Sequence, residues 1–345
     1  MAMAEYCPFC NNESTRYFSI GDLNQELSRK RFDYYRCQTC GLIFLSPIPS
    51  DLSCYYQSSY AAYQKPDVKD LNGKAEQERY KLEIVQSFIS SGRLLEIGPG
   101  YGGFAFLAKQ AGFEVETIEM DPCCCQFLSE VIGVRAINAA NVCDAMPDIG
   151  SYDVIALWHV LEHLIDPWST LHELAGKLQP GGIIVIATPN PASLQFRIFG
   201  RFWTHVDAPR HLELIPMELL IKRMESLGLK SVLATTSDKA STIFSTFGWW
   251  RISLKNIWKA IPSLFSRRNK SYLQPHVDTH NDVNPASSSR YLPLVRKLLF
   301  SPFIALDKFK TAILRFIFSY ILKPIERTEG LGCAYTTIFK KVESS

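Results

Sequence analysis

Apolar and polar positions alternate along the middle of the chain in blocks that match two kinds of element. Short apolar runs predict strands, and the stretches between them repeat apolar residues at helical spacing. Strands that alternate with helices favour a parallel sheet covered by helices on both faces, which is an α/β fold. The predicted strands cover residues 93–97, 114–119, 135–138, 152–158, 183–188, 230–236 and 334–342.

The ends of the other predicted elements carry the expected residues. Residues 216–228 begin with a proline in the first helical turn and end on a glycine, as helices commonly do. Residues 70–90 have helical spacing, and the sequence QPGG at 179–182 predicts a turn before the next strand. We expect irregular structure at 46–68, rich in Pro, Ser and Tyr, and in the polar stretch 276–290.

Four of the ten cysteines form two C-x-x-C pairs, Cys7 with Cys10 and Cys37 with Cys40. The 26 residues between the pairs give the spacing of a structural zinc ribbon. Four thiolates would complete a tetrahedron around Zn²⁺ and leave no open position for chemistry. Unligated thiols are the alternative, and the two regular pairs argue against them. We therefore expect these cysteines to hold a structural zinc ion.

These patterns divide the chain into five expected parts. The first is a small zinc-ribbon-like module, and the second is a connector with an N-terminal helix. A sheet-and-helix core follows, interrupted before its last strand by a helical, basic insertion. The boundaries are 1–45 for the module, 46–92 for the connector and helix, 93–236 for the core, 237–331 for the insertion and 332–345 for the last strand.

A glycine-rich turn, Glu96-Ile-Gly98-Pro-Gly100-Tyr-Gly102-Gly103, joins the first strand of the predicted sheet to the next helix. Glycines allow a close approach of the backbone to a ligand, and the following helix N-terminus offers free N–H groups. A tight turn without a ligand and a dinucleotide site are the alternatives, and the glycine spacing alone does not separate them. The acidic Glu96 argues against a dinucleotide site, because dinucleotide-binding strands usually carry an apolar residue at that place.

The segment LLEIGPGYGGF resembles the first motif of the class I S-adenosylmethionine-dependent methyltransferases. Three later segments, SYDVIALWHVLEHLIDP, LQPGGIIVIATPN and WTHVDAPRHLELIPMELLIKRMESLGL, resemble further motifs of the same family. The similarity is to the subgroup that includes ubiquinone-biosynthesis O-methyltransferases, and it extends over about half of the chain. It implies a seven-stranded, Rossmann-like sandwich that binds S-adenosyl-L-methionine.

The resemblance also implies roles for single residues. Glu96, Gly98, Gly100 and Gly102 would line the methionine and ribose part of the cofactor, and Glu119 would hold the ribose hydroxyls. An acid at the position of Glu119 also suits NAD, so it indicates a nucleoside rather than one particular cofactor.

Three more residues fall at cofactor-binding places of the family. Asn141 and Val142 follow the third strand, where members contact adenine, and Trp158 ends the fourth strand beside the expected sulfonium. Many members have Gly-Asp-Ala at the adenine position, whereas this chain has Ala-Asn-Val, so the adenine contacts depart from the pattern.

Four histidines follow the fourth and fifth strands, the edge at which open α/β sheets bind ligands. They are candidates for a base that accepts a proton near pH 7, with Asp207 as a candidate to orient one of them. A surface or structural role is the alternative for any one taken alone, and their clustering favours function. The four candidates are His159, His163, His205 and His211.

The pentapeptide His159-Val-Leu-Glu162-His163 also matches the H-x-x-E-H signature of zinc proteases. That site needs a helix that holds both histidines on one face. Here the motif directly follows a strand and ends at Asp166-Pro167, which disfavours a protease. Some related methyltransferases hold a divalent metal at this place, and Glu162 with His163 leaves that alternative open.

Basic residues are concentrated in the last third of the chain. Residues 251–327 contain 14 Lys/Arg and four acids, so they carry +10, against +3 for the whole chain. The apolar runs within 292–323 are too interrupted by charges to span a bilayer. Amphipathic helices on an anionic membrane surface, or a lid or dimer face, are the alternatives, and the charge slightly favours the membrane or an amphiphilic acceptor.

The sequence therefore predicts a methyltransferase that acts on a small-molecule, glycan or lipid-like acceptor, with oxygen favoured as the acceptor atom. The start MAMAEYCPFC lacks a secretory pattern and the thiols are unpaired, so the cytoplasm is expected, with the inner face of the membrane as an alternative. An RNA-modifying enzyme that reads RNA with its ribbon is the second interpretation. Nucleic acid is disfavoured because the stretch 11–36 of the ribbon is not basic. A non-catalytic cofactor-binding protein is the third interpretation.

Overall fold

The computed structural model describes residues 5–56, 65–266 and 315–342, without the side chains of 261–266. The expectations for 276–290 and for most of 292–323 lie outside the described residues. The chain divides into two units, Met1–Asn256 with Glu326–Ser345, and Ile257–Ile325. Within the described residues, no helix is both long and apolar enough to cross a bilayer.

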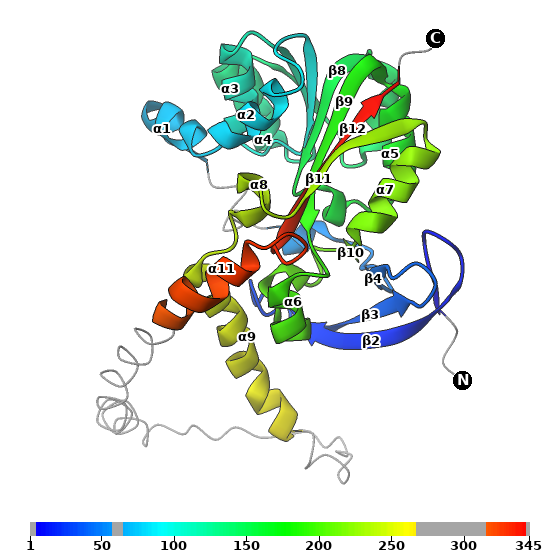
Figure 1. Ribbon diagram of the computed structural model, residues 1–345, viewed down its shortest axis with the longest axis vertical. Helices are drawn as coiled ribbons and strands as arrows, with labels where there is room; N and C mark the ends of the chain where they lie inside the picture. The colour runs from blue at the N-terminus through cyan, green and yellow to red at the C-terminus, as the bar shows by residue number, and fades with distance from the viewer. Residues whose placement is uncertain (1–4, 57–64, 267–314, 343–345) are drawn as a thin grey trace, which may run out of the picture. The chain divides into compact units, whose positions relative to one another are not determined.

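A seven-stranded sheet forms the centre of the first unit (Figure 1). Five neighbouring strands pair in parallel, and β12 lies antiparallel between β9 and β11. This order confirms the expected Rossmann-like sheet, including a last strand that returns from nearly 100 residues further along the chain. The order is β11 (Leu229–Thr235), β12 (Ala334–Lys341), β9 (Leu178–Pro189), β8 (Tyr152–Trp158), β5 (Arg93–Ile97), β6 (Glu114–Glu119) and β7 (Arg135–Asn138).

Helices cover both faces of this sheet. Successive strand residues face opposite sides, and in β5 residues on both sides are apolar, so each face needs a covering layer. Leu94 of β5 packs in one apolar core with α2 (Arg79–Gln86) and α3 (Gly103–Gln110). Leu95, the next residue, packs in a second core with α5 (Pro167–Gly176) and α7 (Met217–Ser226). In Figure 1, α1 (Leu71–Glu76), α2, α3 and α4 (Pro122–Phe127) lie on one side of the sheet and α5 and α7 on the other.

The remaining helices come from the inserts before and after β11. Two short ones, α6 (Leu194–Phe199) and α8 (Lys239–Thr242), belong to the first unit. The boundary between the units falls within α9 (Phe247–Ser266) and again at the end of α11 (Lys323–Glu326). The described parts of the expected insertion 237–331 thus include α8, α9 and α11.

Two details differ from the sequence expectations. The expected helix 70–90 is broken into α1 and α2, with Gln77 and Glu78 between them. The expected turn 179–182 lies inside β9, whose pairing with β8 jumps from Leu178 to Ile183. Residues 179–182 are left out of this pairing, and Gly181 among them has a φ of 78°. The expected turn is therefore present, as an interruption within a longer strand.

The N-terminal residues form a second, antiparallel sheet. Its order is β1 (Glu5–Tyr6), β2 (Glu13–Gly21), β3 (Arg31–Cys37), β4 (Ile43–Leu45) and β10 (Glu213–Leu214). The last strand, β10, comes from the segment directly after His211, and it pairs with β4. The N-terminal module is therefore joined to the methyltransferase-like part through a shared sheet and through the core that contains Leu95.

Candidate functional site

The glycine-rich loop follows β5 at the carboxyl edge of the parallel strands. Gly98 and Gly102 have φ angles of 64° and 73°, in the left-handed region that favours glycine. A Cβ atom on Gly98 would lie 2.6 Å from Val160, and one on Gly102 would lie 2.4 Å from Leu128. The loop is thus held close to the chain after β8 on one side and to the helix after β6 on the other.

Glu119, at the end of β6, fixes this loop. One carboxylate oxygen accepts a hydrogen bond from the Gly100 N–H, and the other accepts one from the Asp121 N–H, both at 2.9 Å. Burial raises the pKa of Glu119, and the backbone N–H groups oppose this rise. Each oxygen keeps a second lone pair, so the carboxylate can still accept from the hydroxyls of a ligand.

Glu96 and Trp158 lie at the ends of the neighbouring strands β5 and β8, and both are buried. Glu96 Oε2 and Trp158 Nε1 have no hydrogen-bond partner within the described part of the chain. Burial raises the pKa of Glu96 to about 8, although the Lys81 ammonium lowers it. Buried polar atoms are normally paired, so these two atoms suit a polar ligand at the carboxyl edge.

The expected adenine-side residues lie after β7. Asn141 is exposed and caps a short helical segment, Val142–Asp148, by accepting from the Cys143 N–H at 3.1 Å. Val142 is buried in the core on the α5 side of the sheet. The side-chain carbonyl of Asn141 is thus used within the protein, and its exposed position leaves the amide end accessible to a ligand.

His159 follows β8 directly and lies next to the glycine loop, because its neighbour Val160 contacts Gly98. It has a φ of 58°, which is uncommon for a residue with a side chain. Its Nδ1 lies 3.7 Å from Glu162 Oε1, and its ring meets Phe244 edge-on at 4.8 Å. Its Nε2 is buried and without a partner among the described residues.

Glu162 is the carboxylate at the centre of the four histidines. Its Oε2 accepts a hydrogen bond from Thr188 Oγ1 at 2.8 Å. Burial would raise its pKa, but His159 and the nearby His211 and His163 lower it to about 2. Glu162 is therefore ionised at neutral pH.

Asp207, expected to orient a histidine, is bonded elsewhere. Both of its carboxylate oxygens accept hydrogen bonds from the Arg210 guanidinium, at 2.9 and 2.7 Å. Glu162 is the carboxylate that lies beside His159, in the role expected of Asp207.

Of the other candidate histidines beside Glu162, His205 and His211 are buried and His163 is half-buried. Burial lowers the pKa of His163 to about 4 and that of His205 to about 3, with His211 adding to both shifts. His163 and His211 meet edge-on at 4.5 Å, and His205 stacks on Trp249 at 5.3 Å. His163 and His205 are thus neutral near pH 7. His159 and His205 contact the ring of Phe244, and His205 also contacts that of Trp249.

Three residues of this cluster could also hold a metal ion. Ligand atoms of Glu162, His163 and His211 all lie within 4.8 Å of one another. A carboxylate with two imidazoles is a donor set that suits divalent transition metals.

Residues from the N-terminal module and from the connector after it reach this site, and sequence reasoning missed them. Tyr56 Oη lies 2.9 Å from His163 Nδ1, and Tyr34 donates a hydrogen bond to the backbone carbonyl of His211 at 2.7 Å. Asp22, in the loop after β2, forms an ion pair with Arg210. No local pattern marks these residues, since each becomes relevant only through a partner more than 100 positions away.

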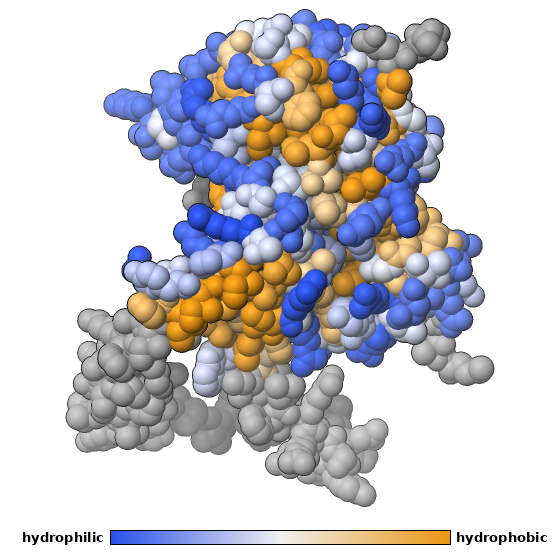
Figure 2. All heavy atoms as spheres, in the orientation of Figure 1, coloured by the Kyte–Doolittle hydropathy of each residue, from blue (hydrophilic) through white to orange (hydrophobic). Residues whose placement is uncertain are grey.

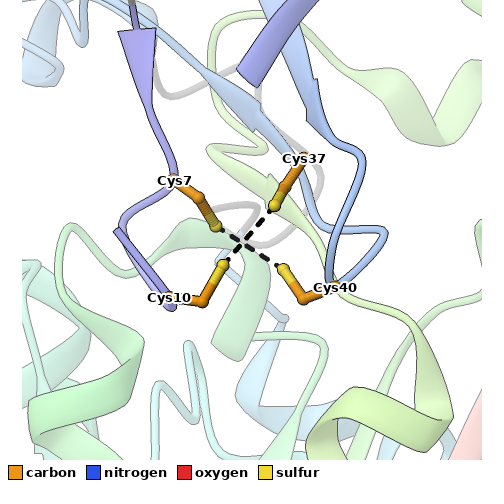
Figure 3. A group of neighbouring side chains, drawn as sticks. All are labelled: Cys7, Cys10, Cys37 and Cys40. Carbon is orange, nitrogen blue, oxygen red and sulfur yellow. Dashed lines mark hydrogen bonds between the residues drawn. The ribbon is translucent and has the colours of Figure 1, made fainter. Parts of the chain in front are cut away.

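The four cysteines of the N-terminal module converge on one point (Figure 3). The Sγ atoms of Cys7 and Cys40 are 3.6 Å apart, those of Cys10 and Cys37 are 3.5 Å apart, and all four lie within 4.8 Å. Burial raises the pKa of the Cys37 thiol, but the backbone N–H groups of Cys40 and Thr39 bring it down to about 6. This four-cysteine cluster fits a tetrahedral zinc ion.

The comparisons with known proteins agree with this geometry. Residues 72–234 match the family model of a methyltransferase domain. These residues form a class I S-adenosylmethionine-dependent methyltransferase domain. The matched range contains the glycine loop, Glu119 and all four candidate histidines. The four-cysteine cluster lies outside it.

Two relatives are similar over part of their length. A ubiquinone biosynthesis O-methyltransferase of Alkalilimnicola ehrlichii is 30% identical over 117 residues, which cover 31% of this chain and 47% of that protein. A 2-methyl-6-phytyl-1,4-hydroquinone methyltransferase of Synechocystis is 29% identical over 179 residues, covering 49% of this chain and 54% of that protein. The chain thus spans about half the length of these curated relatives.

Among solved structures, a SAM-dependent methyltransferase from Archaeoglobus fulgidus is similar with a TM-score of 0.45 and 18% identity. The match covers 77% of this chain and 94% of that one.

Proposed function

We propose that this methyltransferase domain transfers a methyl group from S-adenosylmethionine to a hydroxyl group of a small or lipid-like molecule. The observation that carries the proposal is the pairing of His159 with the ionised Glu162, directly beside the glycine loop. The two relatives, one named for ubiquinone biosynthesis and the other for a hydroquinone, support a small-molecule acceptor.

The cofactor is assigned to the loop of Gly98, Gly100 and Gly102. Glu119 holds the loop and offers its remaining lone pairs to the ribose hydroxyls. The unpartnered oxygen of Glu96 suits the amino group of the methionine part, and Trp158 lies at the end of the adjoining strand. When bound, the cofactor would supply a methyl group on a sulfonium. The acceptor oxygen would attack the methyl carbon in line with the carbon–sulfur bond, which breaks as the methyl group is transferred.

The protein's part in that reaction is to align the acceptor and remove its proton. His159 Nε2 accepts the hydroxyl proton, and Glu162 stabilises the imidazolium that forms, through His159 Nδ1. His163 and His205 stay neutral and help to position the acceptor, with Phe244 and Trp249 as apolar walls. An acceptor with an apolar body fits such walls better than a strongly charged one.

We assign a structural zinc ion to the four-cysteine cluster. Four cysteine ligands leave no open coordination position, so zinc would support the fold of the module and take no part in methyl transfer. The module in turn positions His211 through Tyr34, and the connector after it positions His163 through Tyr56.

We also propose that the second unit contacts a membrane surface from the cytoplasmic side. Among its described residues, Trp258 and Tyr320 are about 70% exposed, and Phe316 and Ile321 are more than half exposed. Figure 2 shows apolar side chains gathered where α11 and the helical turn before it lie. The stretches 257–266 and 315–325 contain three basic residues and no acid, which suits anionic lipid.

Methyl transfer is tested with labelled S-adenosylmethionine and a panel of phenols, sugar alcohols and amines, with RNA as a separate arm. His159→Gln should lower kcat about 10²- to 10⁴-fold on a hydroxyl acceptor and leave the affinity for S-adenosylmethionine unchanged. The exposed His172→Gln is the matched control. Methylation of RNA or amines alone, or full activity of His159→Gln, would contradict the proposal.

Membrane contact is tested by co-sedimentation with vesicles. The protein should bind vesicles rich in phosphatidylglycerol and not those of pure phosphatidylcholine. A Trp258→Ser/Tyr320→Ser variant should lose this binding, whereas Tyr17→Ser, an exposed aromatic in the N-terminal module, should retain it. Equal binding by all three proteins would reject this surface.

A further inference from the structure

A cavity of about 290 Å³ lies between the N-terminal module and the chain that follows the histidine cluster. Its volume is near the lower end of the range of small-molecule sites, about 300–1,000 Å³. The walls include Phe44 and Leu45 from the module and Ile48 from the connector. Ile165, Leu212 and Glu213 come from the methyltransferase domain. The site is separate from the cofactor loop and contains none of the proposed catalytic residues.

Glu213 is the ionisable group that lines this cavity. It lies on β10, and its backbone is held opposite Phe44 of β4. Its side chain is only 4% exposed, and Oε2 has no hydrogen-bond partner within the described residues. Burial raises the pKa of Glu213 to about 8 and nearby Asp166 adds to the rise, while the Trp168 indole opposes it. A buried carboxylate oxygen without a donor destabilises the protein unless a ligand supplies one.

Among the described residues, those that line the cavity are mostly apolar and none is positively charged. The nine residues that line the cavity include no Lys, Arg or His. Three of the lining side chains remain accessible at its rim, namely Ile165 at 69% exposure, Tyr6 at 57% and Ile48 at 37%. A further carboxylate, that of Glu5, lies beside the rim, where it accepts a hydrogen bond from Ser46 Oγ at 2.8 Å. The two carboxyl groups therefore disfavour an anion, and Glu213 complements a cation once it has released its proton.

We propose that this cavity is a second ligand site, which binds a small organic amine with an apolar body. The ammonium group donates a hydrogen bond to Glu213, and the apolar body contacts Phe44, Ile48 and Ile165. A charge-assisted bond to a buried carboxylate is stronger than one between neutral groups. Because the ammonium favours the ionised carboxylate, binding near pH 7 transfers the carboxyl proton of Glu213 to the buffer. The site requires no methyl transfer, so its test is independent of the proposed activity.

The test is calorimetric titration of the whole protein with 2-phenylethylamine and with 2-phenylethanol, which has the same body without the charge. The amine should bind at least about tenfold more tightly than the alcohol, since only the amine forms the charge-assisted bond. The heat of amine binding should also change with the ionisation enthalpy of the buffer, as proton release requires. Both features should disappear in Glu213→Gln and persist in Glu218→Gln, which changes an exposed acid in the first turn of α7.

A second variant keeps the test decisive if Glu213→Gln folds poorly. Ile165 is mostly exposed, so Ile165→Ser should fold normally and weaken amine binding by removing one wall. Equal affinity for amine and alcohol, no binding of the amine, or unchanged amine binding by both variants would overturn the proposal.

Discussion

Asp22 and Arg210 are 188 positions apart in the sequence, and their side chains form an ion pair of 2.7 Å that is entirely buried. The same guanidinium binds Asp207 at 2.7 Å. The pair connects the loop after β2 of the N-terminal module to the segment that carries His205 and His211. The module is therefore part of the acceptor side of the site, as well as a carrier of the four-cysteine cluster.

Removal of Arg210 is expected to destabilise the first unit strongly. Arg210→Met leaves Asp22 and Asp207 buried without their counter-ion, and breaking a buried pair in this way costs about 3–5 kcal/mol. The free energy of unfolding, measured by denaturation in urea, should fall by that amount. The control is Arg16→Met, which removes an exposed pair with Asp33 and should cost less than about 1 kcal/mol. Similar losses of unfolding free energy in the two variants would show that the buried ion pair stabilises the protein no more than the exposed one.

Glu119→Gln is expected to weaken cofactor binding. The glutamine amide has only one oxygen, so it cannot accept from both the Gly100 and the Asp121 N–H groups as the carboxylate does. The affinity for S-adenosylmethionine in calorimetry should fall at least about tenfold, the equivalent of about 1.4 kcal/mol. Glu114→Gln, at the exposed start of the same strand, should bind like the unchanged protein. An unaltered affinity of Glu119→Gln would mean that the loop does not hold the cofactor.

Replacement of two cysteines is expected to release the metal. Cys37→Ser/Cys40→Ser removes one knuckle of the four-cysteine cluster, so the zinc content should fall from one ion per chain to none. Cys54→Ser is the control, because Cys54 is exposed and lies outside the cluster. Zinc is measured by elemental analysis after dialysis. Full retention of zinc in the double variant would refute the site.

The sheet was predictable from the sequence because its signals are local. Runs such as 93–97 and 152–158 are apolar and end at a glycine loop or a polar residue, and the structure has strands with the same bounds. The convergence of the four cysteines was predictable for a similar reason, since each C-x-x-C pair is one short knuckle.

The acceptor side was predictable only in part. The order of the motifs brought the four histidines to one edge of the sheet. Asp207 and Arg210, like His159 and Glu162, are only three positions apart, but they lie outside any α-helix, so their spacing alone does not tell which side chains meet. Asp22 and Tyr56 were missed because their role depends on contacts between segments more than 100 residues apart. Likewise, β10 is only two residues long, too short for any pattern of alternation to appear.

The pH dependence of stability should change when Glu96 is replaced. Its pKa is about 8 in the folded protein, above its ordinary value of 4.5, because burial disfavours the charged form. Its contribution to stability is therefore complete below about pH 4.5 and is lost as the pH rises towards 8. Glu96→Gln has no such proton to lose.

We compare the free energies of unfolding of Glu96→Gln and of the unchanged protein, both without cofactor. As the pH rises, the difference between them should shift in favour of the variant. The gain should reach up to about 1.4 kcal/mol per pH unit between about pH 5 and 8 and level off above, as measured by urea denaturation across this range. The exposed Glu83→Gln should show no trend relative to the unchanged protein. A constant difference for Glu96→Gln from pH 5 to 8 would contradict the raised pKa, because a carboxyl that ionises at its ordinary pH in the folded protein gives the two proteins parallel stability curves.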